Sequence, residues 1–324
     1  MNKLLNNRFI ALLKLARIEN LVMTALTLYM LRYFVLQKIL IGHSLSLVLN
    51  DRFFGVLVLS TVFIAAAGYI INDYFDVKTD LINHPDTVVV DKVIKRRSAI
   101  ILHLTFTFTG IALGILCSLK AGYLRLALFH FLSAILLWFY STHFKKQLLI
   151  GNIVVSLLSA SVIFVPLVYE IGLMQRTQPD FSPVHSLAIL KCVKVTLIFS
   201  VFAFLSSMAR EIIKDMEDFK GDKETGGHTL PIYWGMAAAK LTAFFLLLIV
   251  VLLLLFVAYN TFKVIHDPAN IQILYILFAL VLPLLLLMFS LMKAKESLQF
   301  KRASLFLKMI MLSGLCFSII YYYF

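Results

Sequence analysis

Two clusters of acidic residues hold the side chains whose types and spacing suggest chemistry. Eleven of the 17 aspartates and glutamates lie within 72–97 and 210–231, two short segments of a chain of 324 residues. Each cluster contains three aspartates in the pattern D-x2-D-x3-D, which are Asp73, Asp76 and Asp80 in the first and Asp215, Asp218 and Asp222 in the second. In both copies a lysine, Lys78 or Lys220, stands two residues before the last aspartate. Chance would produce such a pattern about 0.01 times in this chain, so the repeat indicates a function.

The aspartate spacing predicts a magnesium site made of two halves. In a helix, residues i, i+3 and i+7 lie on one face, and like charges placed there destabilise the helix unless cations lie between them. Carboxylates without a histidine or thiolate cluster nearby suit Mg²⁺, which takes one or two carboxylates together with substrate phosphate oxygens. Neither segment matches the D-x-D-x-D-G calcium loop. We therefore expect two aspartate stripes to hold a phosphorylated ligand through metal, whereas Asp86, Asp91 and Glu224 are equally well explained as solvated surface.

The elements that position these stripes are expected to be membrane helices. The chain is 61% hydrophobic and 15% charged, against about 25% charged in soluble domains, so a soluble globular protein is excluded. Its apolar runs have the length of bilayer-spanning helices. We predict one all-α polytopic domain over 1–324, with about nine transmembrane helices around a central cavity that opens to the cytoplasm. The spans are expected near 18–38, 53–72, 98–118, 123–141, 148–170, 186–208, 238–262, 270–292 and 303–323.

Basic residues set the expected orientation. The loops on the N-terminal side carry 20 lysines and arginines and the opposite loops carry 7, so the N-terminus is predicted to be cytoplasmic and Phe324 external. Four spans separate the acidic clusters, which places both on the cytoplasmic face. The net charge of +13 is then explained by basic loops beside anionic lipid rather than by nucleic acid. No obligatory protein partner is evident, and the three cysteines show neither disulfide nor zinc spacing.

A cation transporter built from inverted repeats is an alternative explanation of paired acidic segments. Such a transporter is expected to hold its carboxylates near the middle of the membrane. The predicted spans of this chain contain almost none. The acidic clusters instead follow the second and sixth spans, which favours an enzyme site at the cytoplasmic ends of these helices.

The motifs resemble those of the UbiA-type intramembrane prenyltransferases, a family of nine-helix enzymes. Asn72-Asp73-x2-Asp76-x3-Asp80 and Asp215-x2-Asp218-x3-Asp222 look like the paired aspartate motifs of this family. The stretch Tyr140-Ser141…Lys145…Gly151-Asn152, after the fourth predicted span, is also similar. The resemblance covers most of the chain and implies transfer of a prenyl group from a prenyl diphosphate to a membrane-soluble or amphipathic acceptor.

The resemblance also implies which residues form the site. The six motif aspartates would hold two Mg²⁺ on the diphosphate: Asp73, Asp76, Asp215 and Asp218 as direct ligands, Asp80 and Asp222 through water. Further diphosphate contacts would come from Asn72, Lys145, Lys214 and Lys220, and the catalytic residues would be Lys145, Asp73 and Asp218. Breaking the allylic C–O bond leaves negative charge on the diphosphate, which the metal ions and lysines would stabilise. Aromatic faces would shield the allylic cation from water.

The acceptor is the less determined part of the prediction. Residues 210–222 and Thr229-Leu230-Pro231 are most similar to the branch that transfers geranylgeranyl to geranylgeranylglyceryl phosphate, with homogentisate prenyltransferases next. We therefore expect a glycerol-phosphate lipid alcohol, with an aromatic quinone precursor as the alternative. The usual two arginines after the first motif are missing from 83–88, which means a less anionic acceptor or compensation by Lys92, Lys95, Arg96 and Arg97. His84, in this segment, is equally well explained as a surface histidine or a ligand.

Overall fold

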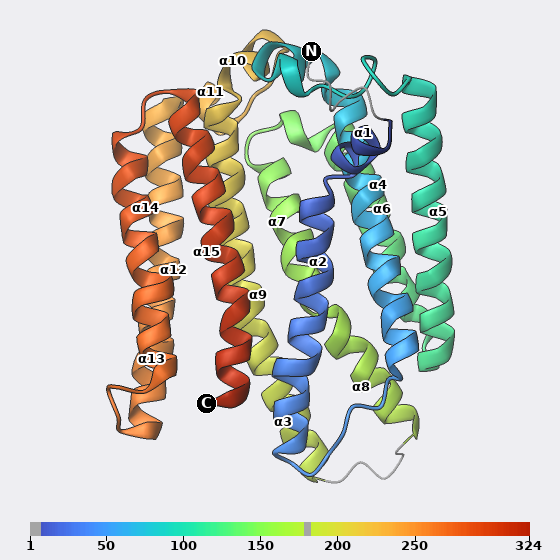
Figure 1. Ribbon diagram of the computed structural model, residues 1–324, viewed down its shortest axis with the longest axis vertical. Coiled ribbons are helices and arrows are strands. Elements are labelled where there is room, and N and C mark those ends of the chain that lie inside the picture. Colours follow the sequence, from blue (N-terminus) through green and yellow to red (C-terminus); the bar gives the residue numbers. More distant parts are fainter. Residues whose placement is uncertain (1–7, 178–182) are drawn as a thin grey trace.

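The computed structural model describes residues 8–177 and 183–324 and is an all-α bundle (Figure 1). Its α-helices are α1 (Arg8–Leu15), α2 (Ile18–Met30), α3 (Gln37–Ile41), α4 (Asp51–Asn83), α5 (Arg96–Ala121), α6 (Ala127–Thr142), α7 (Ile150–Val162), α8 (Val165–Thr177), α9 (Pro183–Glu217), α10 (Phe219–Glu224), α11 (Leu230–Tyr233), α12 (Gly235–Ile265), α13 (Ile271–Tyr275), α14 (Leu282–Lys293) and α15 (Ser297–Tyr323). Short π-helical segments, Leu31–Leu36 and Ile276–Val281, join α2 to α3 and α13 to α14.

The expected transmembrane architecture is confirmed. In the described part of the chain, eight helices are long and apolar enough to cross a membrane, or nine if one bent pair counts as a span. The bent pair is α7 and α8, which meet at 46° where the sequence predicts a single span over 148–170. Pro166, near the start of α8, lacks the N–H that a continuous helix would need, which explains the break. The protein is an integral membrane protein.

The helix that carries the first acidic cluster has clear start and stop signals. The side chain of Asn50 caps α4 by accepting a hydrogen bond from the backbone N–H of Arg52 (2.8 Å). The helix then continues for 33 residues and ends at Asn83, because His84 precedes Pro85 and a residue before proline disfavours the helical conformation. The predicted extension of the second span beyond the membrane, which places three aspartates on one helix, is therefore confirmed.

The second acidic cluster is arranged differently from the first. Helix α9 ends at Glu217 and α10 begins at Phe219, so Asp218 stands at a break between two helices. Its backbone angles (φ −89°, ψ 5°) lie outside the helical range. Asp215 is thus on α9 and Asp222 on α10. The repeated pattern in the sequence does not correspond to two identical helical stripes.

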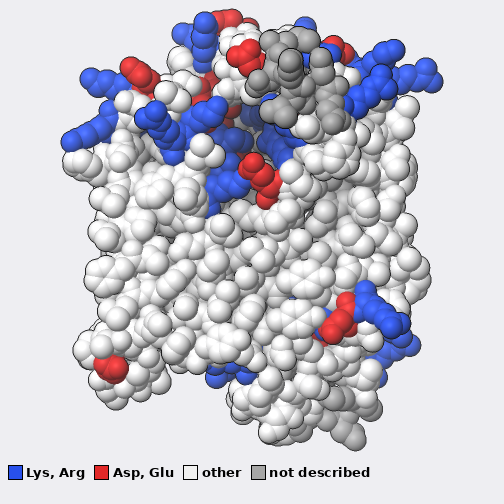
Figure 2. All heavy atoms as spheres, in the orientation of Figure 1, with Lys and Arg blue, Asp and Glu red and all other residues white. Residues whose placement is uncertain are grey.

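Packing brings both clusters to the same end of the bundle. Helix α4 packs against α5 and α6, whereas α9 packs against α7, α12 and α15, and the short α10 packs on α4. Figure 1 shows α10, α11 and the described N-terminal helix at this end, with Phe324 at the other. Lysines and arginines crowd the same end above a broad uncharged band (Figure 2). Lys3, one of the basic residues counted in the sequence, lies outside the described residues.

Candidate active site

A cavity of about 710 Å³ runs into the bundle beside the two acidic clusters. Seven lysines and arginines and six aspartates and glutamates line it, and Figure 2 shows charged side chains around a hollow at the basic end of the molecule. Deeper in the bundle the lining is mostly apolar, with Leu137, Leu158, Phe202, Leu254 and Leu284 as examples from five different helices. The cavity thus combines a charged mouth with an apolar interior, which suits an amphipathic molecule with an anionic head.

Helix α4 presents its polar residues to this cavity at intervals of four. Asn72, Asp76 and Asp80 all line it, as do Asp73 and His84, the residue that directly follows the helix. The Nδ2 of Asn72 donates to Asp76 Oδ2 (2.6 Å), which fixes both side chains on adjacent turns. Asp80 is half-buried one turn beyond Asp76. The three aspartates of the predicted first stripe, Asp73, Asp76 and Asp80, therefore all line the cavity from one helix, and their role as metal ligands remains a prediction.

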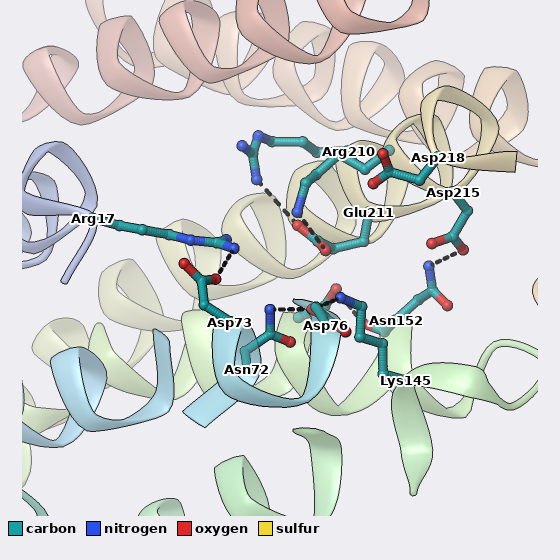
Figure 3. Close-up of polar contacts among 12 residues, drawn as sticks. Arg17, Asn72, Asp73, Asp76, Lys145, Asn152, Arg210, Glu211, Asp215 and Asp218 are labelled. Carbon is teal, nitrogen blue, oxygen red and sulfur yellow. Dashed lines mark hydrogen bonds and ion pairs between the residues drawn. The ribbon is translucent and has the colours of Figure 1, made fainter. Parts of the chain in front are cut away.

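Cations from other elements neutralise two of these aspartates. Arg17, between α1 and α2, donates to Asp73 Oδ1 (2.7 Å), and its guanidinium also lies over the Tyr69 ring at 5.3 Å. Lys145, from the short turn after α6, forms an ion pair with Asp76. Figure 3 shows Arg17 and Lys145 reaching these aspartates from opposite sides. Burial disfavours the charge on Lys145, but Asp76 outweighs it and holds the pKa of Lys145 well above its usual value.

The backbone around Gly151 positions Lys145. A Cβ at Gly151 would lie 2.7 Å from the carbonyl oxygen of Phe144 and 2.8 Å from the Cα of Lys145. Contacts this short require the backbone to move, so only glycine lets the start of α7 pack directly on the Lys145 turn. The glycine in the Tyr140–Asn152 stretch identified in the sequence is therefore explained by its close contact with the Lys145 turn.

We expect Gly151→Ala to move Lys145 away from Asp76. It should lower the rate of the prenyl transfer that the motif resemblance implies by about tenfold to 100-fold and reduce the thermal midpoint in detergent by several degrees. Gly55→Ala is a matched control, because a Cβ there meets its first neighbour, the Tyr29 hydroxyl, at 3.9 Å. If both variants had wild-type activity, the close approach at Gly151 would not matter for the site.

Helix α9 provides the facing half of the site. Glu211 accepts from Arg210 Nη1 (3.1 Å) and from Lys214 Nζ (3.5 Å), and all three side chains line the cavity. Asp215 is not among the cavity-lining residues and instead accepts a hydrogen bond from Asn152 Nδ2 (2.8 Å). This bond ties α9 to α7 on the outer side of the site (Figure 3).

At the helix break, Asp218 pairs with His84. The His84 Nε2 lies 2.8 Å from Asp218 Oδ1, and this hydrogen bond raises the pKa of His84 above its usual value. Burial on its own raises the pKa of Asp218, but the bond from His84 and the nearby Lys214 and Lys145 leave that pKa below its usual value. Burial raises the pKa of Asp222 to about 6. Asp218 is therefore a carboxylate in the cavity, held by cations from two other elements.

The structure thus gathers most, but not all, of the residues predicted from the sequence. Those that line the cavity are Asn72, Asp73, Asp76, Asp80, Lys145, Lys214 and Asp218. Asp215, Asp222 and Lys220 are absent from the lining, and Lys220 is exposed on α10. The break at Asp218 explains the absence of Lys220 and Asp222, because it turns the residues that follow away from the helical face of α9. Asp215, which precedes the break, is instead held by Asn152. Their assigned roles remain predictions.

Several charged residues at the cavity were not predicted as part of the site. They are Lys14, Arg17, Arg210, Glu211, Glu217, Lys301 and Lys308. Lys308 is the clearest, because it lies within the membrane-spanning α15 and its Nζ is 3.4 Å from Glu19 Oε2. A lysine inside an apolar span is itself a functional signal, and that signal was available in the sequence.

The sequence profile of the UbiA prenyltransferase family matches residues 40–313. A digeranylgeranylglyceryl phosphate synthase from Methanosphaera stadtmanae is 31% identical over 234 residues, covering 72% of this chain and 75% of that protein.

Solved structures agree on the fold. A UbiA homolog from Aeropyrum pernix superposes with a TM-score of 0.63 at 15% identity, covering 91% of this chain and 98% of the other. A UbiA homolog from Archaeoglobus fulgidus bound to DMAPP and Mg²⁺ gives a TM-score of 0.55 at 17% identity, covering 95% and 99%. The family resemblance predicted from the sequence is confirmed, because the family profile covers most of the chain and the solved structures share its helical fold. This chain belongs to the UbiA prenyltransferase family.

Proposed function

We propose that the protein transfers a prenyl group, geranylgeranyl, from a prenyl diphosphate to a glycerol-phosphate lipid alcohol, with Mg²⁺ as cofactor. The observation that carries this proposal is the meeting of Asp76 on α4 and Asp218 after α9 at one cavity, with Lys145 beside them. The name of the relative from Methanosphaera stadtmanae supports the choice of acceptor. The structure from Archaeoglobus fulgidus, bound to DMAPP and Mg²⁺, supports the choice of donor and metal.

The side chains present fit a magnesium ion. Asn72 Oδ1 is buried and has no hydrogen-bond partner among the described residues, although its Nδ2 is held by Asp76. A buried oxygen without a partner is costly unless a ligand satisfies it. The carboxylates of Asp76, Asp80 and Asp218 line the same cavity and, like this amide oxygen, are oxygen donors of the kind that Mg²⁺ prefers. These four residues would hold the metal, with Asp73, Asp215 and Asp222 as the further predicted ligands.

The chain's own residues would divide the work of the reaction. Bound Mg²⁺ would offset the negative charge that develops on the departing diphosphate. Lys145 would donate to a diphosphate oxygen, and its charge would stabilise the leaving group as the allylic C–O bond breaks. The prenyl tail would occupy the apolar part of the cavity, and Tyr69, Tyr140 and Phe199 in the cavity wall would keep water from the allylic cation. The acceptor hydroxyl would then form the new C–O bond and lose its proton.

The cations around the cavity support a phosphorylated acceptor. Arg17 pairs with Asp73 and Arg210 pairs with Glu211. A bound metal ion would neutralise the carboxylates that hold it. The cationic side chains at the cavity mouth would then outnumber the carboxylates that are still charged. Lys301 and Lys308 lie two turns apart on α15, and both line the cavity, so they would face a second anionic group beside the diphosphate. This arrangement compensates for the arginines missing from 83–88.

A product assay tests the proposal. Purified protein would receive geranylgeranyl diphosphate with geranylgeranylglyceryl phosphate, 4-hydroxybenzoate, 1,4-dihydroxy-2-naphthoate or homogentisate in parallel. We expect a doubly prenylated ether lipid by mass spectrometry, and we expect EDTA to abolish it. A prenylated aromatic ring would contradict the acceptor and leave the reaction class intact. Ion flux in liposomes without prenyl transfer would contradict the enzyme function itself.

We also propose that the N-terminus and both acidic clusters face the cytoplasm. Single cysteines at Lys92, Gln147 and Lys223, all exposed at the end of the bundle that holds the acidic clusters, should react with an impermeant maleimide only after cytoplasmic access. A cysteine at Thr177, exposed at the end of α8, should react from outside. The native Cys117 and Cys192 are buried, and Cys316 would be replaced by serine. Labelling with the reverse sidedness would contradict the orientation.

A further inference from the structure

A histidine and two carboxylates meet at the mouth of the cavity. His84 follows the last residue of α4, Glu217 ends α9, and Asp218 stands at the break before α10. One ligand atom from each lies within 4.8 Å of the others, with His84 Nε2 at 2.8 Å from Asp218 Oδ1 and 3.7 Å from Glu217 Oε1. All three side chains line the cavity. Their donor atoms are close enough for one ion to contact all three.

His84 directly follows the helix that carries the proposed magnesium ligands. Asn72, Asp76 and Asp80 lie at intervals of four residues, and His84 occupies the next position. The imidazole therefore adds a nitrogen donor one turn beyond the oxygen donors assigned to Mg²⁺. Asp218 lines the same cavity as these residues and its Oδ1 contacts His84 Nε2, so it belongs both to the proposed magnesium ligands and to the group around the histidine.

Other contacts hold the two helix ends together without any ion. The Nδ2 of Asn83 donates to the carbonyl oxygen of Asp218 (2.9 Å), and its Oδ1 accepts from the backbone N–H of Gly221 (2.8 Å). A Cβ at Gly221 would lie 2.5 Å from Asn83 Nδ2, so glycine is needed for this approach. These contacts hold His84 and Asp218, which are 134 positions apart in the chain, close to each other. The three donors therefore need little rearrangement to bind a cation.

We propose that His84, Glu217 and Asp218 form a mixed nitrogen and oxygen site for a divalent transition-metal ion, adjoining the magnesium ligands. An imidazole nitrogen favours Mn²⁺, Co²⁺ or Zn²⁺ over Mg²⁺, which prefers oxygen and keeps its water. Lys301 interacts electrostatically with His84 and Glu217 and would face the substrate anion once the ion is present. This site would add a second kind of metal ion to the proposed enzyme. It rests on the proposed function only because Asp218 belongs to both groups of ligands.

Pulsed electron paramagnetic resonance with Mn²⁺ tests the site without turnover. Tag-free protein in detergent, loaded with Mn²⁺ and without substrate, should show the ¹⁴N modulation of a coordinated imidazole. His84→Asn should lose this modulation while Mn²⁺ still binds at the oxygen ligands. His228→Asn, at an exposed histidine outside the cavity lining, should keep it. A wild-type protein that binds Mn²⁺ without ¹⁴N modulation would overturn the proposal, as would modulation that persists in His84→Asn.

Affinities give a second, independent measurement. In calorimetric titrations, His84→Asn should weaken Co²⁺ binding about tenfold or more and leave Mg²⁺ affinity nearly unchanged. Glu217→Gln should weaken Co²⁺ binding but retain the ¹⁴N modulation, because the imidazole is still present. Equal Co²⁺ affinity in wild type and His84→Asn would contradict the site. Imidazole coordination in a protein that fails the prenyl-transfer assay would instead contradict the proposed function and leave this inference standing.

Discussion

Replacing Asp76 or Asp218 with asparagine should lower prenyl transfer about 100-fold or more while the protein still folds and inserts. Asparagine keeps the shape of aspartate but removes the charge that binds the metal. The two carboxylates come from different halves of the fold and face one cavity, so each loss disables the same diphosphate site. In Asp76→Asn, Lys145 also loses its ion-pair partner. Initial rates at saturating Mg²⁺ and prenyl diphosphate would measure the effect.

Asp86→Asn is the matched control for this pair. Asp86 is exposed in the loop after α4 and is not part of the cavity lining, so the same chemical change should leave turnover close to wild type. Size-exclusion profiles and thermal midpoints would show that all three variants are folded. If Asp76→Asn and Asp218→Asn both kept near-normal turnover, the model of two half-sites would be wrong.

Lys145→Gln should reduce kcat about 100-fold, because it removes a positive charge from the position where the diphosphate leaves. The side chain of Lys145 is directed at Asp76 (Figure 3), and the tight approach of Gly151 keeps its backbone in place. The loss should appear mainly in kcat, since negative charge on the diphosphate grows as the C–O bond breaks. Single-turnover rates with radiolabelled geranylgeranyl diphosphate would separate this step from binding.

Lys146→Gln provides the comparison at the next residue. Lys146 is exposed and does not line the cavity, although it belongs to the same short turn. We expect its turnover to stay within about twofold of wild type, as is usual for surface changes. Equal losses in the two variants would mean that the turn acts through its fold, and that the Lys145 charge has no specific role.

The membrane helices and the acidic clusters were predictable from the sequence alone, whereas Lys145 was identified only through the family resemblance. Hydropathy over about 19 residues and the spacing of side chains along one helix are local properties, so the spans and the row from Asn72 to Asp80 could be identified without distances. The even number of spans between the clusters also placed both at one end. For the same reason, the position of Lys308 inside an apolar span was visible in the sequence.

The tertiary structure decided which of these residues face one another. The break at Asp218 turns Asp222 and Lys220 out of the cavity lining, and Asp215 bonds to Asn152 on a neighbouring helix. A repeated motif gives no sign of this asymmetry, because helix ends and rotations depend on packing against other elements. The meeting of His84 with Asp218 joins positions 134 residues apart. Such a contact arises only when α10 packs on α4, since the pattern within either segment holds no information about the distance between them.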